Sequence, residues 1–514
     1  MTIMNKPKKW FGDLFRRRIY VMFLLLLQII LMIFFIVSGS KYLWINDTLK
    51  FLSLLVSLHI IAKHDKVAYK LTWVFLILLF PLFGGLFYLI FQFQSSPRKF
   101  SKYLEKIGHD TRELYTLPNS KNIKYNDCLN KYSNLVSYFE NFSSFPLYDK
   151  TETKFLSSGE MYFEELLDSL KNAKKYIFLE SFIIKEGIMW NSILEILKEK
   201  VEQGVTVRVI YDDVGCFLLL PFNYPKILES IGIECVVFNK FRPLWTTVQN
   251  NRYHRKNLVI DGKVAFNGGI NLGDEYINRI EKYGHWKDTA IMLTGDAVKS
   301  FTLMFLQMWN ITETSHDDFK KYILIEEKQE DSHGYIMPYG DSPLDNENVG
   351  ENVYMDILAT AKKYVHIMTP YLIIDNEMIT ALTYAAKRGV DVKIILPHIP
   401  DKKYAFMLAR TYYLELIKAG VKIYEYIPGF VHAKVFSCDD EKAVVGTINL
   451  DFRSLYLHFE CATFIYKAPV IKDIEDDYNE TLKKCKKVTL EDYKNLNVFY
   501  KIGGGILKLF APLM

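Results

Sequence analysis

A spaced pattern of polar residues occurs twice in this sequence of 514 residues. Each copy has a histidine, then Lys at +2, Asp at +7, two small residues at +14 and +15, and Asn at +17. The copies consist of His254, Lys256, Asp261, Gly268, Gly269 and Asn271, and of His432, Lys434, Asp439, Gly446, Thr447 and Asn449. Because each copy supplies an imidazole, an ammonium group and an amide, the pattern predicts one phosphate site assembled from two halves.

The repeat extends well beyond this motif. The segments 173–177 and 361–365 both read Ala-Lys-Lys-Tyr followed by a β-branched residue, and each opens an apolar run typical of a buried strand. A helical stretch follows in each half and ends at Gly204 or Gly389, before a run rich in Val and Ile. The sequence therefore predicts an α/β fold of two similar lobes, with mixed, mostly parallel sheets flanked by helices and a pseudo-two-fold axis between the lobes.

These residues resemble the phospholipase D superfamily, whose signature is HxK(x)4D(x)6G[GST]xN in duplicate, and within it the bacterial cardiolipin synthases. The stretches 211–215, 369–371 and 446–454 add to the resemblance, which extends from about Leu71 to the C-terminus. A single HxK(x)4D is a weak pattern, whereas two copies with the trailing small residues and Asn are specific. The fold implied is that of two phospholipase D-type lobes.

The chemistry of phosphodiester exchange suits the paired motif. One imidazole can form a covalent phosphoryl intermediate, and the other can pass a proton to the leaving oxygen and later take one from the acceptor. The resemblance implies His254 as the nucleophile, although the residues alone leave this choice open. The predicted catalytic residues are His254, Lys256, Asp261, His432, Lys434 and Asp439, with Asn271 and Asn449 binding phosphate. Asp261 and Asp439 are expected to anchor the motif strands, and no metal or other cofactor is expected.

One carboxylate follows each motif. Asp288 in Trp286-Lys287-Asp288 aligns with Glu460 in His458-Phe459-Glu460, and either side chain can accept a hydrogen bond from a histidine ring and orient it. We predict that Asp288 and Glu460 orient the two motif histidines. His285, His398 and His458 have no partner in the sequence pattern and are expected to be structural.

Two further interpretations remain open from the residues. Tyr211, Asp212 and Asp213 could line the pocket or cap the end of the preceding strand. Arg255, between the motif His and Lys, is a candidate contact for a lipid phosphate.

The N-terminal region is strongly apolar. Ile19 to Val37 follows three arginines and is long enough to span a bilayer, Leu71 to Phe93 is a second candidate, and Leu43 to Ala62 is a weaker third. We expect N-terminal transmembrane helices within a membrane region over 1–95 and a multi-pass protein of the cell membrane. Basic clusters flank these segments, and the positive-inside rule favours catalytic lobes on the cytoplasmic face, whereas a full third span would place the lobes outside.

The remaining boundaries follow from the repeat. We expect a linker over 96–140, the first lobe over 141–325, the second over 326–490 and an amphipathic tail over 491–514. The tail could lie in the membrane interface or pack on the protein surface. Six cysteines without a pairing pattern indicate free thiols in a reducing compartment, and zinc-type ligand spacing is absent from the sequence.

The leading functional hypothesis is a cardiolipin synthase, which transfers a phosphatidyl group from one phosphatidylglycerol to another through a phosphatidyl-histidine intermediate and releases glycerol. A phospholipase D that uses water, or a transphosphatidylase with a different alcohol, carries the same motifs and stays an alternative. The membrane segments argue against a nuclease, so we expect no nucleic acid partner. Both motif sets are complete, which disfavours a scaffold with a decayed site. The expected partners are phosphatidylglycerol, cardiolipin and the membrane, with the oligomeric state left open.

Overall fold

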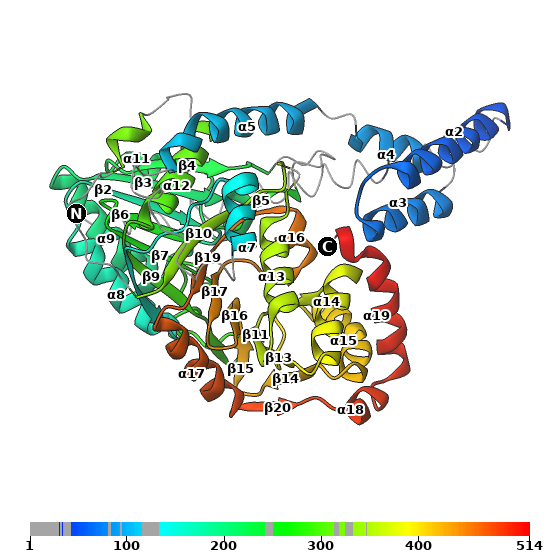
Figure 1. Ribbon diagram of the computed structural model, residues 1–514. Helices are drawn as coiled ribbons and strands as arrows, with labels where there is room; N and C mark the ends of the chain where they lie inside the picture. The colour runs from blue at the N-terminus through cyan, green and yellow to red at the C-terminus, as the bar shows by residue number, and fades with distance from the viewer. Residues whose placement is uncertain are drawn as a thin grey trace.

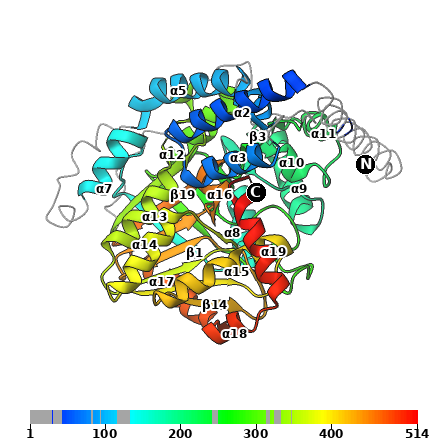
Figure 2. The same ribbon diagram turned by 90° about the vertical axis from the view of Figure 1, so that its right-hand side faces the viewer.

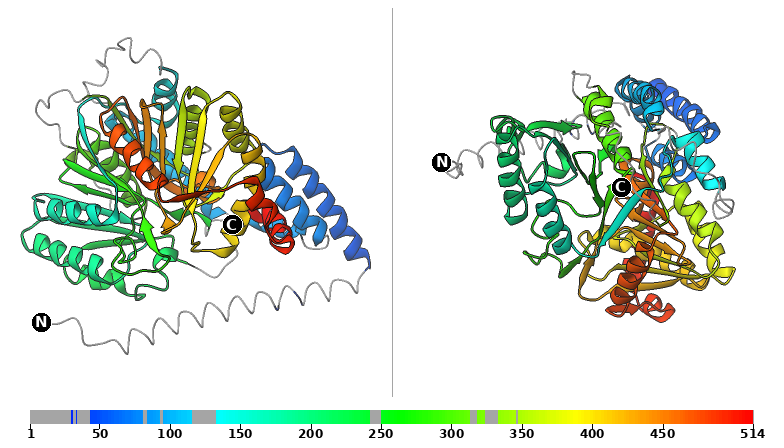
Figure 3. Two further views of the ribbon diagram at one scale, coloured as in Figure 1. Left: turned by 90° about the horizontal axis from the view of Figure 1, so that it is seen from below. Right: turned by 60° about the vertical axis from the view of Figure 1, so that its left-hand side comes forward.

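The computed structural model describes residues 30, 33, 43–80, 84–92, 95–115, 133–241, 250–312, 318–323, 333–345 and 347–513. Two α/β lobes lie side by side, and the helices of residues 43–92 lie at one end of the second lobe (Figure 1). Figure 3 shows the first lobe in green beside the second in yellow and orange.

The first lobe contains a seven-stranded sheet in the order β1-β9-β7-β6-β2-β3-β4. Its strands are β1 (Thr151–Leu156), β2 (Tyr176–Ser181), β3 (Thr206–Asp212), β4 (Glu234–Phe238), β6 (Asn257–Ile260), β7 (Val264–Gly268) and β9 (Ala290–Gly295). The helices of this lobe are α8 (Gly159–Lys171), α9 (Ile188–Glu202), α10 (Asp213–Cys216), α11 (Tyr224–Glu229) and α12 (Val298–Thr312).

The second lobe repeats this topology. Its sheet has the order β10-β19-β17-β16-β11-β13-β14-β20, so the first seven strands follow the pattern of the first lobe. The strands are β10 (Tyr335–Asp341), β11 (Tyr364–Met368), β13 (Asp391–Pro397), β14 (Lys422–Tyr426), β16 (Val435–Cys438), β17 (Lys442–Gly446), β19 (His458–Tyr466) and β20 (Cys485–Lys487), with β12 (Leu372–Ile373) and β18 (Leu450–Asp451) forming a small separate pair. The helices are α13 (Val349–Thr360), α14 (Asn376–Lys387), α15 (Lys403–Lys418), α16 (Phe452–Tyr456), α17 (Val470–Leu482), α18 (Leu490–Lys494) and α19 (Val498–Phe510). The prediction of two similar α/β lobes with mixed sheets is confirmed.

The prediction that the sheets are mostly parallel is wrong. In the first sheet only β2–β3 and β3–β4 are parallel, and the other four pairs are antiparallel. The physical reason is the length of the connections. The motif strands β6 and β7 are joined by only three residues, 261–263, and so short a connection permits an antiparallel hairpin but no parallel crossover.

The two sheets face one another and share a core. Apolar side chains from both lobes, among them Phe178, Leu293, Val445 and Ile465, form one contiguous buried cluster. The helix α12 adds Phe301, and most of its residues are buried because it is covered by sheet strands on one side and by α5 on another. The position of one lobe relative to the other is therefore fixed by apolar burial.

Two short strand pairs join the lobes at their interface. β5 (Arg252–Tyr253) of the first lobe pairs in parallel with the start of β19 in the second. β15 (Gly429–Val431) of the second lobe pairs in parallel with β8 (His285–Lys287) of the first. Each pair joins the residues just before one motif histidine to a strand of the opposite lobe, and this arrangement positions the site.

The N-terminal helices are α2 (Leu43–Ala62), α3 (Val67–Leu79), α4 (Gly84–Gln92), α5 (Ser95–Tyr115) and α7 (Ser133–Tyr138). α2 coincides with the weakest of the three predicted apolar segments, the second segment is divided into α3 and α4, and all of Ile19–Val37 except residues 30 and 33 lies outside the described residues. Within the described part of the chain, none of the helices combines the length and the apolar character that a membrane crossing requires. Lys66, in the turn before α3, contacts Glu351 and Asp375 of the second lobe.

The motif aspartates anchor the hairpin turns. Asp439, with φ of 56°, accepts hydrogen bonds from the backbone N–H groups of Lys362, Lys363 and Tyr364 at 2.7–2.8 Å. Asp261 makes the same three contacts to 174–176 in the first lobe. One carboxylate thus fastens each motif hairpin to the start of the central strand.

Replacing Asp439 by Ala should lower the free energy of unfolding by about 2–3 kcal/mol, because three backbone donors lose a charged acceptor. Asp439→Asn keeps an acceptor oxygen and tolerates the positive φ, so it should lose less. Thermal unfolding of the purified protein measures both. Equal losses in the two variants would contradict the anchoring role.

Candidate active site

Both motif histidines lie at the interface between the lobes, and each contacts a carboxylate of the opposite lobe. His254 Nδ1 lies 2.8 and 2.9 Å from the two oxygens of Glu460. His432 Nδ1 lies 2.6 Å from Asp288 Oδ2. All four side chains are buried, and both carboxylates have no exposed surface. A carboxylate at Nδ1 holds the proton there and leaves the Nε2 lone pair for chemistry.

The two strand pairs at the interface place each motif histidine beside a carboxylate of the opposite lobe. In the pair of β5 and β19, Arg252 lies opposite His458 and Tyr253 opposite Phe459, so the next residues in each strand are His254 and Glu460. In the pair of β15 and β8, the residues that follow the last paired positions are likewise His432 and Asp288. The backbone N–H of His254 donates to Phe459 O at 2.9 Å, and that of His432 donates to Lys287 O at 2.7 Å.

The small residues at +15 of each motif adjoin the carboxylates. A Cβ on Gly269 would overlap Asp288 Oδ1, so glycine is required for the close approach of this side chain. Thr447, at the equivalent place, donates a hydrogen bond from its hydroxyl to Glu460 Oε2. The same motif position therefore accommodates the carboxylate in both halves. Gly269 leaves room for Asp288, whereas Thr447 donates a hydrogen bond to Glu460.

The two motif lysines form a buried cationic pair. Lys256 Nζ donates to His254 O at 2.6 Å, and Lys434 Nζ donates to His432 O. Burial lowers the pKa of Lys256 to about 7 and that of Lys434 to about 8, although the carboxylates Glu460 and Asp288 act in the opposite direction. The site holds more basic groups than carboxylates, and a bound anion would stabilise the charged ammonium forms.

Burial and the neighbouring charges also shift the pKa values of the two motif histidines. Burial, followed by the charges of Lys256 and Lys434, lowers the pKa of His254 well below its ordinary value. Burial and Lys434 lower the pKa of His432 to about 4, with Asp288 opposing the shift. The lowered pKa values favour the neutral form of both rings near pH 7. A neutral ring is the form required of a nucleophile, and a phosphate anion would favour protonation of the other ring.

The motif asparagines differ in their contacts. Asn271 donates to Tyr276 Oη at 2.8 Å and accepts from the backbone of Ile183 at 3.1 Å. Asn449 is buried, and its Oδ1 has no hydrogen-bond partner among the described residues. The phosphate-binding role of both amides stays a prediction.

His458 is the residue that the sequence interpretation placed outside the site. Its ring centroid lies 5.4 Å from that of His254, and its Nδ1 lies 3.6 Å from Glu460 Oε1. Trp286 occupies the equivalent place two residues before Asp288, with its ring 5.2 Å from His432. The alignment of 286–288 with 458–460 could have indicated this contact. His285 and His398 instead contact Tyr426 and Glu425.

The sequence comparisons agree with this geometry. A family model described as "Cardiolipin synthase, PLD-like domain" matches residues 166–309 and 354–482, and a "Phospholipase_D-nuclease N-terminal" model matches residues 51–92. The chain belongs to the cardiolipin synthase family of phospholipase D-like proteins.

Individual relatives cover most of the chain. An uncharacterized protein of Streptococcus mutans is 50% identical over 86% of this chain and 96% of its own length. Cardiolipin synthase 2 of Bacillus anthracis is 33% identical over 86% of each chain, and the cardiolipin synthase of a Geobacillus strain is 32% identical over 93% of this chain and 94% of its own. A phosphatidylserine synthase structure from Haemophilus influenzae covers 75% of this chain and 98% of its own at a TM-score of 0.55 and 17% identity, which supports the fold.

Asp212 caps the end of β3, the strand that precedes the first motif. Its carboxylate accepts hydrogen bonds from the N–H groups of Val214 and Gly215 and from that of Tyr253 at 2.9 Å. Asp213 accepts from Phe241 N at 2.6 Å. Of the two interpretations left open for these aspartates, the structure supports capping of the strand end.

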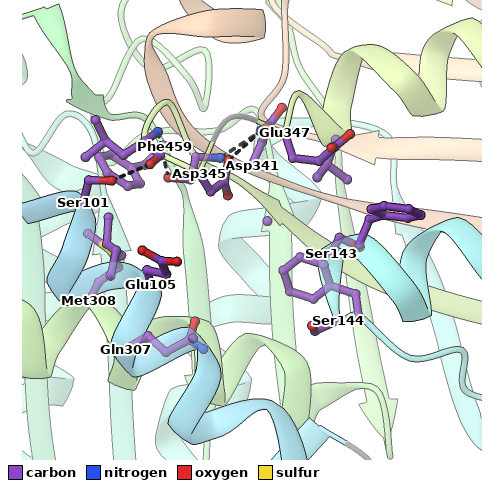
Figure 4. Close-up of a pocket in the computed structure, with 18 of the residues that line it drawn as sticks. Ser101, Glu105, Ser143, Ser144, Gln307, Met308, Asp341, Asp345, Glu347 and Phe459 are labelled. Atoms are coloured by element: carbon purple, nitrogen blue, oxygen red, sulfur yellow. Dashed lines mark hydrogen bonds between the residues drawn. The ribbon is translucent and has the colours of Figure 1, made fainter. Parts of the chain in front are cut away.

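Arg255 does not share the environment of His254. It lines a separate pocket of about 320 Å³ that neither motif histidine lines, and its Nε donates to the backbone oxygen of Glu460 at 3.0 Å. The pocket also contains the acidic side chains Glu105, Asp341, Asp345 and Glu347 (Figure 4). Burial raises the pKa of Asp345 to about 6. So many carboxyl groups disfavour an anionic phosphate in this pocket, which argues against the interpretation of Arg255 as a contact for a lipid phosphate.

Replacing Asp288 by Asn should lower kcat by about 10²–10³-fold, within the range of a general acid–base contribution. Asp288 raises the pKa of His432 against the larger effect of burial, so its loss lowers that pKa further. The protonated ring then becomes rarer, and the basic limb of the kcat–pH profile should move to lower pH. Steady-state kinetics across pH measures both effects, and an unchanged profile with normal kcat would contradict the orienting role.

Proposed function

We propose that this protein is a cardiolipin synthase that converts two molecules of phosphatidylglycerol into cardiolipin and glycerol. Family membership over most of the chain supports this proposal, together with the relatives named cardiolipin synthase. The observation that carries it is the pair of buried histidines, each held at Nδ1 by a carboxylate of the opposite lobe, with both motif lysines buried as well. One imidazole can act as the nucleophile while the other acts first as acid and then as base, which is the arrangement that a two-step phosphodiester exchange uses.

In the first step, His254 Nε2 attacks phosphorus and the P–O bond to the terminal glycerol breaks. His432, protonated when the anionic lipid is bound, gives its proton to the departing alkoxide. The result is a phosphatidyl group on His254 and free glycerol. Lys256 and Lys434, both buried, would neutralise the non-bridging oxygens, and transition-state charge is the part of the reaction that such preorganised donors stabilise most.

In the second step, the terminal hydroxyl of another phosphatidylglycerol attacks the phosphatidyl group. Neutral His432 takes the hydroxyl proton, the P–N bond to His254 breaks, and cardiolipin leaves. One phosphodiester replaces another, so the reaction needs no nucleotide. The roles of the two histidines follow the family assignment, since the two halves are chemically alike.

The surroundings of the histidines favour an alcohol over water as acceptor. Aromatic rings pack against both, with Phe182 at 5.0 Å from His254 and Tyr276 at 5.6 Å from His432 between ring centroids. Both histidines are less than one-tenth exposed. Burial of both rings against aromatic side chains limits the access of bulk water to them, which supports the transferase over the hydrolase alternative.

Purified protein in detergent, given phosphatidylglycerol alone without nucleotide, should release cardiolipin and glycerol in equal amounts. His254→Asn should lose this activity by several orders of magnitude, because no covalent intermediate can form. Phosphatidic acid with glycerol as the products would instead identify a hydrolase. The matched control is His333→Asn, an exposed histidine whose replacement should leave the rate unchanged.

We also propose that α2, α3 and α19 attach the protein to the bilayer of the cell membrane, with the N-terminal region crossing it and the lobes on the cytoplasmic face. Figure 2 shows the three helices on one side of the molecule, and the hydroxyl of Thr72 in α3 donates to Leu509 O in α19 at 2.8 Å. These helices expose large apolar side chains that water does not favour, namely Phe51, Leu54, Leu55, Leu58, Ile61, Val67, Leu71, Leu78, Leu79, Val498, Phe499, Ile502, Ile506 and Leu509. So large an apolar surface is typical of a membrane contact.

Replacing both Phe499 and Ile502 by Ser should weaken binding to phosphatidylglycerol-containing vesicles, because the apolar area that these side chains bury in the bilayer is lost. Each 1.4 kcal/mol of lost binding free energy lowers the affinity about tenfold. Both side chains are more than half exposed, so the fold itself should be unaffected. Vesicle flotation of a protein lacking residues 1–42 isolates this contact from the N-terminal segment. Unchanged flotation would show that α19 contributes nothing to attachment.

A further inference from the structure

The two halves of the site differ at one position. The residue two before the orienting carboxylate is Trp286 in one half and His458 in the other, and each ring packs against the motif histidine, at 5.2 Å and 5.4 Å between centroids. The indole of Trp286 adds only an aromatic surface and an N–H donor beside His432. The imidazole of His458 adds two nitrogens beside His254, and a neutral imidazole can offer one of them to a metal ion.

Neither nitrogen of His458 has a hydrogen-bond partner among the described residues, although the side chain is more than nine-tenths buried. A buried polar group without a partner is costly. Beside the motif histidine, such a group is a candidate contact for a ligand. The neighbouring side chains determine which kind of ligand it is.

His254, His458 and Glu460 each offer one ligand atom, and these three atoms lie within 4.8 Å of one another. His254 Nδ1 already lies 2.8 Å from Glu460 Oε1, and His458 Nδ1 lies 3.6 Å from the same oxygen. Two imidazoles and one glutamate form a ligand set that zinc uses in proteins, where metal–nitrogen distances of about 2.0–2.1 Å need ligand atoms only a few ångströms apart. Small side-chain rotations would bring all three atoms to a common ion.

We propose that His254, His458 and Glu460 form an inhibitory site for a divalent cation of the zinc class. An ion on His254 Nδ1 displaces the proton that this nitrogen shares with Glu460. In the neutral ring the proton then resides on Nε2, whose lone pair is no longer available to attack phosphorus. Binding of the metal therefore blocks the nucleophile without occupying the position of the phosphate.

The opposite half of the site should not bind metal in this way. Trp286 replaces the second imidazole there, which leaves His432 and Asp288 as only two ligands. Lys256 and Lys434 carry like charge and oppose a cation, so the affinity should lie below that of a structural zinc site. The inhibitory consequence rests on the proposed function, whereas the binding of the ion does not.

Isothermal titration calorimetry of tag-free full-length protein with Zn²⁺ tests the site directly. His458→Phe keeps a packing ring and removes both nitrogens, and it should weaken zinc binding by at least about tenfold, as loss of a ligand-sphere residue does elsewhere. His458→Asn, which is smaller and polar, is the second variant in case Phe perturbs the fold. His333→Phe, at an exposed position, should bind zinc like the original protein. Equal zinc binding by the original protein and both His458 variants would overturn the proposal.

Activity provides an independent readout. Zn²⁺ should inhibit cardiolipin formation reversibly, with full recovery after EDTA, and His458→Phe should need at least about tenfold more zinc for the same inhibition. Equal sensitivity of the original protein and His458→Phe would overturn the inhibitory role. If no cardiolipin forms at all, the proposed function fails, yet the calorimetric comparison still decides whether the metal site exists.

Discussion

The exchange of histidine and carboxylate between the lobes is the contact on which the site depends. His254 and Glu460 are 206 residues apart in the sequence, and His432 and Asp288 are 144 apart. Each pair exists only because β5 reaches β19 and β15 reaches β8 across the interface. One lobe alone would have a motif histidine without its orienting carboxylate. The shared apolar core between the sheets therefore has a catalytic consequence, since it holds both halves in register.

Burial explains the electrostatics of this site. The motif lysines and histidines are less than one-tenth exposed, and desolvation is the largest influence on the pKa of each of the four. The orienting carboxylates oppose the shifts at His432 and both lysines but do not cancel them. Burial thus favours the neutral forms of the lysines and histidines, whereas a bound phosphodiester anion would favour their charged forms. Protonated lysines beside such an anion are donors of the kind that stabilise charge on the phosphoryl oxygens.

The two halves of the site differ at several equivalent positions. Gly269 and Thr447 hold the two carboxylates by different means, and Asn271 is bonded to Tyr276 whereas Asn449 has an unpartnered oxygen. His458 in place of a second Trp adds nitrogens to one half only. The two motif histidines therefore have different surroundings, although both halves carry the same motif.

The sequence by itself determined the α/β class, the two lobes, the motif residues and the family, because these depend on local spacing and periodicity. It failed on the strand directions, since a three-residue connection between β6 and β7 forces a hairpin that an apolar run does not reveal. It also could not predict which carboxylate meets which histidine, or the pocket that Arg255 lines. These depend on strand pairing between segments far apart in the chain. Only the packing of one lobe against the other decides such contacts, because the side-chain pattern of a strand specifies its buried face but not its partner.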